Sequence, residues 1–150
     1  MTVALSGQDT IMINQRVLTD LPDGDCVILE NPNETASVKT GKNGNSIYAL
    51  NESGKQADVK IRVLRGSSDD KFFNNLVTQQ QANFAGFVLM NGKFIKKIGD
   101  GEGNITKDTY IMGGGIFSKL IPAKMNVEGD VSQAVSEYSL KFSNAPRTLG

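Results

Sequence analysis

The residue types that most often carry out chemistry in proteins are scarce in this chain. It has no histidine, which removes the commonest general base, the Ser-His and Cys-His pairs and imidazole metal ligands. The single cysteine, Cys26, cannot form an internal disulfide, and its apolar neighbours in DCVILE favour a buried side chain over a reactive thiol. The carboxylates are scattered over turns. We therefore expect no enzyme and no catalytic residue.

Several stretches imitate ligand-binding motifs but lack a defining residue. SGKQ and TGKN have no Ser or Thr after the lysine and no upstream glycine of a phosphate loop. DGEGNITKD offers oxygen ligands at Asp100, Glu102, Asn104 and Asp108, but Ile105 stands where a calcium loop needs glycine. GGGIFSK lies inside an apolar run, without the strand-turn-helix setting of dinucleotide loops. We expect no metal and no cofactor.

The composition fits one domain of ordinary size. The chain has 150 residues, 39% hydrophobic and 21% charged, which suffices for a sizeable core. Sixteen basic and sixteen acidic residues cancel, so net charge favours neither a nucleic-acid nor a membrane partner. The start MTVALSGQDT lacks the features of a signal peptide, and no run approaches the roughly 20 apolar residues that cross a bilayer. We expect synthesis in a cytoplasm.

Alternation of apolar and polar residues predicts strands through most of the chain. It is clearest over residues 56–63, where Ala57, Val59, Ile61 and Val63 face one way and polar residues face the other. The shorter strands expected before it cover residues 10–14, 25–30, 35–39 and 46–50. One face of such strands must meet protein and the other must meet water.

The period changes after residue 66. Ser67 or Ser68 can cap a helix over residues 69–81, whose core stripe would be Phe72, Phe73, Leu76 and Val77.

Strands return in the last part of the chain. We expect them over residues 84–99, with Asn91-Gly92 as a hairpin turn, over 109–121, and over 133–142. The glycines at 113–115 predict a bulge or a close backbone approach, and the tail from residue 144 is expected to be irregular. The whole predicts a single mainly-β domain, residues 1–150, of two packed antiparallel sheets in a sandwich or barrel-like arrangement with one flanking helix.

The order of these features resembles a known family. Residues 39–44 (KTGKNG) end a short strand, residues 51–54 (NESG) turn a polar hairpin, and the alternating strand ADVKIRVLRGSSDDKFFNNL runs into a helix centred on Leu76. In this order the chain is similar to the tail tube proteins of contractile-tailed bacteriophages (myoviruses). The early stretch of residues 9–30 and the end from residue 116 to 142 also fit.

The resemblance implies a virion structural protein, assembled in the bacterial host cytoplasm. Its subunits would form hexameric rings that stack into a hollow tube, with their inner sheets joined into one large β-barrel lining the lumen. Its partners would be further copies of itself, the tail sheath protein, the tape measure protein, and the baseplate and tail terminator proteins at the tube ends. DNA would only pass through the lumen, and no membrane is involved.

The resemblance also assigns three groups of residues. A projecting hairpin of about residues 40–54 would reach the next ring through Thr40, Lys42, Asn45, Ile47, Tyr48, Leu50, Asn51 and Glu52. The lumen-facing residues would be Gln56, Asp58, Lys60 and Arg62. The sheath-facing residues of the helix would be Lys71, Asn75 and Gln79.

Other interpretations of the sequence stay open. A type VI secretion tube protein shares the architecture and differs in biology. A ligand-binding β-sandwich would use residues 100–104 and the glycine-rich strand to shape a pocket. It would be monomeric at high concentration and would bind a measurable ligand.

Overall fold

The computed structural model describes residues 1–7 and 9–150 of the chain. Its strands are β1 Ala4–Leu5, β2 Thr10–Ile13, β3 Arg16–Val17, β4 Val27–Glu30, β5 Ala36–Thr40, β6 Ser46–Leu50, β7 Ala57–Leu64, β8 Met90–Gly99, β9 Ile105–Lys119, β10 Val135–Asn144 and β11 Arg147–Leu149. The helices are α1 Ser68–Ala82 and the short 3₁₀ turns η1 Glu52–Lys55 and η2 Val131–Gln133. The fold is mainly β, and over the described residues the strand pairs are antiparallel.

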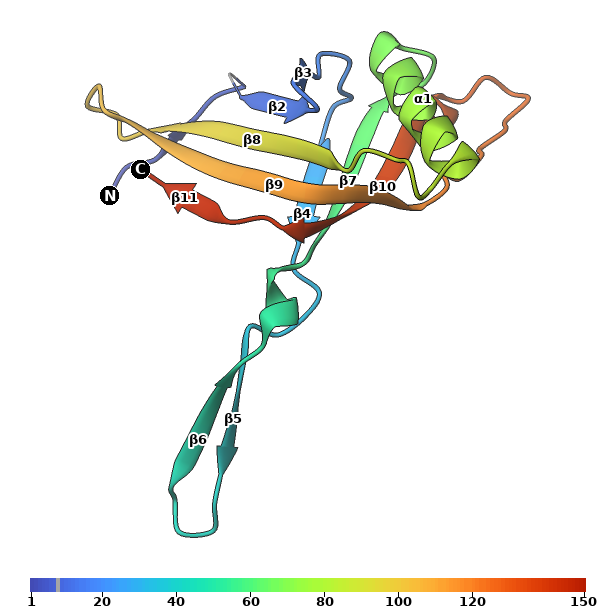
Figure 1. Ribbon diagram of the computed structural model, residues 1–150. Helices are drawn as coiled ribbons and strands as arrows, with labels where there is room; N and C mark the ends of the chain where they lie inside the picture. The colour runs from blue at the N-terminus through green and yellow to red at the C-terminus, as the bar shows by residue number, and fades with distance from the viewer. Residues whose placement is uncertain (8) are drawn as a thin grey trace.

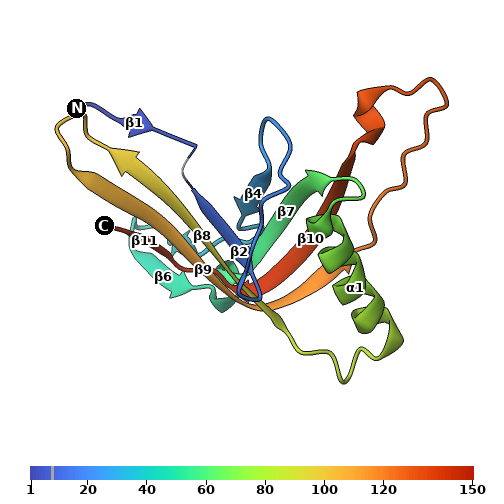
Figure 2. The ribbon, with the colours of Figure 1, turned by 90° about the horizontal axis from the view of Figure 1, so that it is seen from above.

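One large sheet forms the body. Over the described residues it has nine strands in the order β3-β2-β8-β9-β10-β7-β4, with β1 added to β8 and β11 added to β9. Figure 2 shows the sheet bent into a V, with β8 in one limb and β7 and β10 in the other. The bend brings β2 and β4, far apart in the strand order, to opposite walls of one pocket. The predicted mainly-β, sandwich or barrel-like class with a helix is confirmed.

The alternation in the sequence corresponds to the core. Ala57, Val59, Ile61 and Val63 of β7 are fully buried, and the residues between them are half-buried or exposed. The neighbouring strand β10 follows the same rule, because every second residue from Ser136 to Phe142 is buried. Apolar side chains of both strands join others from β2, β8, β9 and α1 in one hydrophobic core, since strands of period two place them on one face.

Helix α1 begins and ends one residue beyond the predicted range. The Ser67 side chain accepts a hydrogen bond from the Asp70 amide and so caps the first turn. The predicted aromatic stripe faces the sheet: the Phe73 ring is fully buried, 5.0 Å from the Tyr138 ring and 6.3 Å from that of Phe117. The helix thereby packs against β7 and β9 (Figure 1).

The predicted turn at Asn91-Gly92 is wrong. Strand β8 runs through both residues with a register irregularity there, and the Asn91 amide donates to the Asn14 side chain. A side chain on Gly92 would lie 2.6 Å from the Met112 methyl group and 2.8 Å from that of Ile13. The glycine therefore allows close packing within the sheet, and the hairpin turn lies at residues 100–104 instead.

The prediction of an irregular tail is also wrong, because β11 pairs with Asp108–Tyr110 of β9. The guanidinium of Arg147 binds the Asp108 carboxylate through two hydrogen bonds of 2.8 Å. The expected feature at the three glycines is present: Gly114 has a positive φ of 65°, and a Cβ on Gly115 would overlap the Phe142 ring.

Candidate assembly surfaces

A two-stranded arm projects from the body. Strands β5 and β6 pair only with each other over the described residues, and Figure 1 shows them extending far below the large sheet. Every residue of both strands is exposed. An isolated two-stranded ribbon is marginally stable in water, so this arm lacks the partner that such a ribbon ordinarily needs.

The arm has two unlike faces. Cross-strand pairing puts Val38 opposite Tyr48, with Leu50 two residues further along the same face. These side chains are 57%, 79% and 72% exposed, respectively. Ile47 lies opposite Lys39 on the other face. The predicted contact residues Ile47, Tyr48 and Leu50 thus do not share a face, and Val38, which the sequence did not single out, completes the apolar one. We call Val38, Tyr48 and Leu50 the apolar arm face.

The tip and the base of the arm are built differently. At the tip, Thr40 and Ser46 share a side-chain hydrogen bond of 2.9 Å, and Lys42 and Asn45 lie in the exposed turn between them. At the base, the predicted contact residue Asn51 accepts a hydrogen bond from the Ser53 amide and caps η1. The second such residue there, Glu52, forms an ion pair of 2.8 Å with Lys55.

A buried glycine fixes the base. A Cβ on Gly54 would lie 2.7 Å from the Cα of Thr35 and 2.8 Å from the carbonyl oxygen of Glu34. The Asn33 side chain bridges this turn by donating to the Ser53 carbonyl and to the Gln56 side chain. Gln56, a predicted lumen residue, therefore helps to anchor the arm, and the arm leaves the body in one defined direction.

The outer face of β7 carries the other predicted lumen residues. Asp58, Lys60 and Arg62 point away from the core, and the register of β4 and β10 places further charged residues beside them. The charged residues on this face are Glu30, Asp58, Glu137, Lys60, Arg62 and Lys141. Glu137 lies opposite Arg62 in the register, and the Lys141 ammonium lies 3.8 Å from Asp58, which has Glu30 opposite it on the other side. We call this surface the mosaic face.

The predicted sheath residues lie on the outside of α1. Lys71, Asn75 and Gln79 are exposed and recur every four residues, opposite the buried Phe73. None of the three has a side-chain partner among the hydrogen bonds and ion pairs of the described residues that involve this helix. They form a polar strip that is free to contact another molecule.

Strand β4 ends the large sheet with a free edge. Its pairing with β7 includes a hydrogen bond from the Arg62 amide to the Cys26 carbonyl. Because hydrogen-bonding direction alternates along an antiparallel strand, the amides and carbonyls of Val27 and Leu29 point away from β7. Over the described residues no strand pairs with that edge. Soluble proteins ordinarily cover such an edge, since it invites association.

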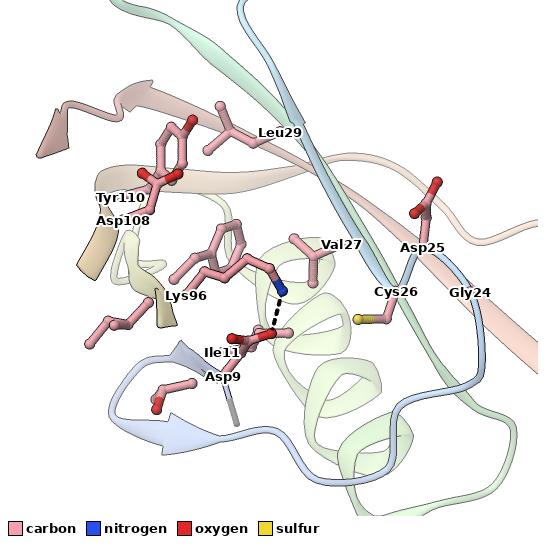
Figure 3. A pocket seen from close by; sticks show the side chains of 13 residues that line it. Asp9, Ile11, Gly24, Asp25, Cys26, Val27, Leu29, Lys96, Asp108 and Tyr110 are labelled. Atoms are coloured by element: carbon pink, nitrogen blue, oxygen red, sulfur yellow. Dashed lines mark hydrogen bonds and ion pairs between the residues drawn. The ribbon is translucent and has the colours of Figure 1, made fainter. Parts of the chain in front are cut away.

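A pocket of about 430 Å³ separates β4 from β2. Apolar side chains including Val27 and Leu29 line it, together with Asp9 and Lys96 (Figure 3). Three of the charged groups already have partners, because Lys96 forms an ion pair of 2.7 Å with Asp9 and the carboxylate of Asp108 binds Arg147; Asp25 also lines the pocket. The pocket is an open gap in the curled sheet and offers a ligand few unpaired polar groups.

A buried and a half-buried carboxylate at the start of α1 make contacts that the sequence does not indicate. Asp69, fully buried, accepts hydrogen bonds from the Thr19 and Asp20 amides and from the Arg16 guanidinium. Asp70 accepts one from the Tyr138 hydroxyl, and burial with this contact raises the pKa of Tyr138. The acidic pair lies at the helix N-terminus, which favours negative charge, and it also ties the helix to β10 and to the loop after β3.

A second exposed apolar surface also escaped the sequence analysis. We call residues 120–134 the connecting loop, because they join β9 to β10. Its most exposed large apolar side chains are Leu120, Met125, Val127 and Val131, between 65% and 103% exposed. The Arg65 guanidinium donates to the Lys124 carbonyl at 2.7 Å and lies 3.5 Å from the Met125 sulfur. The alternating pattern that predicts strands is absent here, so this surface could not be recognised from the sequence.

Other kinds of site are not evident. No cluster of three or more acidic or cysteine side chains within residues 1–7 and 9–150 could hold a metal ion. Among the same residues, no helix is both long and apolar enough to span a membrane. No family model matches the chain, and no curated protein matches its sequence.

Proposed function

We propose that the protein is the structural subunit of a phage tail tube, in which hexameric rings stack into a hollow tube that conducts DNA. The arm is the observation that carries the proposal. It exposes Val38, Tyr48 and Leu50 on a ribbon whose two strands pair only with each other over the described residues. A monomeric protein gains nothing from that exposure, whereas a subunit of a stack buries the ribbon against a neighbour.

The free edge of β4 supports lateral association. The unpaired amides and carbonyls of Val27 and Leu29 can pair with an edge strand of the next subunit in the ring. Closing a sheet around a ring removes its edges. In such a ring the inner sheets of the subunits join into one large β-barrel, and the mosaic face lines the lumen.

The mosaic face suits a surface that DNA must pass. It carries three acidic and three basic residues: Glu30, Asp58 and Glu137 against Lys60, Arg62 and Lys141. Binding of DNA phosphates requires unopposed lysine and arginine, which release counterions on contact. Where acidic residues lie directly opposite the basic ones, the phosphates meet little net attraction, and DNA is not held. The tape measure protein would occupy the same lumen before ejection.

The polar strip of α1 would then face outward. Lys71, Asn75 and Gln79 provide exposed amides and an ammonium for contacts with the sheath. The baseplate and the tail terminator would meet the two ends of the tube. A subunit with these partners would belong to the virion.

Deletion of the arm tests the proposal. The Asn51 amide donates to the Thr35 carbonyl at 2.8 Å, so an Asn-Gly turn can replace residues 36–50 without moving the body. The shortened subunit should keep its circular dichroism spectrum and melting temperature, and it should form rings but no tubes in negative-stain microscopy. Tubes of normal length from this variant would overturn the proposal.

A further inference from the structure

The connecting loop and the arm leave the body in opposite directions. In Figure 1 the arm hangs below the large sheet, and the connecting loop lies above it beside α1. Both expose apolar side chains, with Leu50 at 72% and Val131 at 82% as examples. The two surfaces cannot meet within one copy.

The connecting loop has a defined shape. Beyond the contacts of Arg65, the Gln133 side chain accepts a hydrogen bond of 2.8 Å from the Asn126 amide and closes the loop on itself. Asp130 caps η2 by accepting one of 3.0 Å from the Ser132 amide. Met125, Val127 and Val131 are thus displayed on a structured segment, whose binding would cost little ordering entropy.

The charges of the two surfaces are complementary. Residues 36–50 of the arm contain Lys39 and Lys42 and no acidic residue. Residues 125–134 of the connecting loop contain Glu128 and Asp130 and no basic residue. The arm therefore carries net positive charge, and the connecting loop, which also contains Lys124, carries net negative charge concentrated at Glu128 and Asp130. Complementary charge of this kind sets the register and excludes wrong partners.

We infer that the connecting loop is the surface that receives the arm of a second copy of this chain, in the next ring. The inference rests on the proposed function and adds the receiving residues to it. The apolar arm face packs on Met125, Val127 and Val131, and Lys42 in the tip turn meets the acidic residues. Lys39, on the opposite face of the thin ribbon, adds positive charge within about one Debye length of them. Such a contact is heterologous, because it joins different surfaces of the two copies. Repeated, it gives an open stack in which every arm points the same way.

Charge exchange tests this contact. The variant K39E/K42E and the variant E128K/D130K should each raise the critical concentration for tube growth by on the order of tenfold, because they place like charges together. The variant with all four substitutions should return it close to that of the unmodified protein. Failure of the fourfold variant to recover, with the single pairs impaired, would overturn the inference.

Cross-linking tests the same contact through the proximity of two residues, without relying on a change in the free energy of assembly. In a C26S background, oxidation of tubes carrying Y48C and V131C should give a ladder of covalent oligomers on a non-reducing gel, and either cysteine alone should give none. Tubes that form normally but give no ladder would overturn the docking surface and leave the proposed function standing. Unmodified protein that forms neither rings nor tubes would overturn both.

Discussion

Replacement of Leu50 by threonine isolates the contribution of the apolar arm face. Threonine keeps the preference for extended backbone, so the arm itself is preserved. In the isolated subunit Leu50 is 72% exposed, and the substitution should change the free energy of unfolding by less than about 0.5 kcal/mol. Full burial of a leucine side chain contributes about 1.5–3 kcal/mol, of which about 1–2 kcal/mol therefore remains to be gained on docking.

This loss of docking free energy can be measured as a higher critical concentration for tube growth. At about 1.4 kcal/mol per factor of ten, the critical concentration for tube growth should rise about 5- to 30-fold. Pelleting of tubes over a dilution series measures it. Ala49→Thr is the matched control, since it introduces the same side chain on the same strand but on the opposite face. Equal increases of the critical concentration in the two variants, or no increase in Leu50→Thr, would show that the apolar arm face is not the docking face.

Three further predictions concern the body and the base of the arm. Tyr138→Phe should lower the free energy of unfolding by about 1–3 kcal/mol, because the half-buried carboxylate of Asp70 loses a hydrogen-bond donor. Urea denaturation measures this, and an unchanged midpoint would contradict it. Gly54→Ala should impair tube growth and leave rings intact, because its Cβ collides with backbone at the arm base; normal tubes in the microscope would count against a rigid base. Arg147→Gln should raise the pKa of Asp108, which the guanidinium holds below its ordinary value. A lowered carboxyl pKa stabilises the fold above the ordinary Asp pKa of about 3.9, so the difference in stability between the unmodified protein and the variant should vanish as the pH falls through the pKa of Asp108 in the folded protein. NMR titration measures the pKa of Asp108, and acid unfolding measures the stability. An Asp108 pKa that is the same in both proteins would contradict the prediction.

Much of the sheet could be predicted from the sequence because burial leaves a local pattern. In β7 and β10 one face is sealed in the core and the other is exposed, so alternation around Ile61 and Leu140 records the strand directly. The helix was equally visible from its cap at Ser67 and its aromatic stripe. These signals come from neighbours in sequence.

What could not be predicted depends on partners distant in sequence. Asn91-Gly92 has the local preferences of a turn, yet the packing of Met112 and Ile13 against Gly92 keeps it within a strand. Strand β11 is short and follows Pro146, and only its pairing with β9 makes it extended. Strand β5 alternates like a half-buried strand and β6 is mostly apolar, so the sequence does not show that both faces of the arm are exposed.

The same limit applies to the site. The sequence indicated the arm residues Tyr48 and Leu50, but the cross-strand partner Val38 follows only from the register. The connecting loop has no period, and its role as a surface depends on Arg65, a residue distant in sequence. Charge on the mosaic face could be listed residue by residue from β7 alone, whereas its balance needs the pairing with β4 and β10.

Electron microscopy of the concentrated purified protein tests most directly whether the arm and the free edge of β4 require other copies of the chain. We expect closed rings stacked into hollow tubes, in which each arm contacts the next ring. Particles that stay single up to millimolar concentration, with the arm and the β4 edge still exposed to solvent, would contradict it.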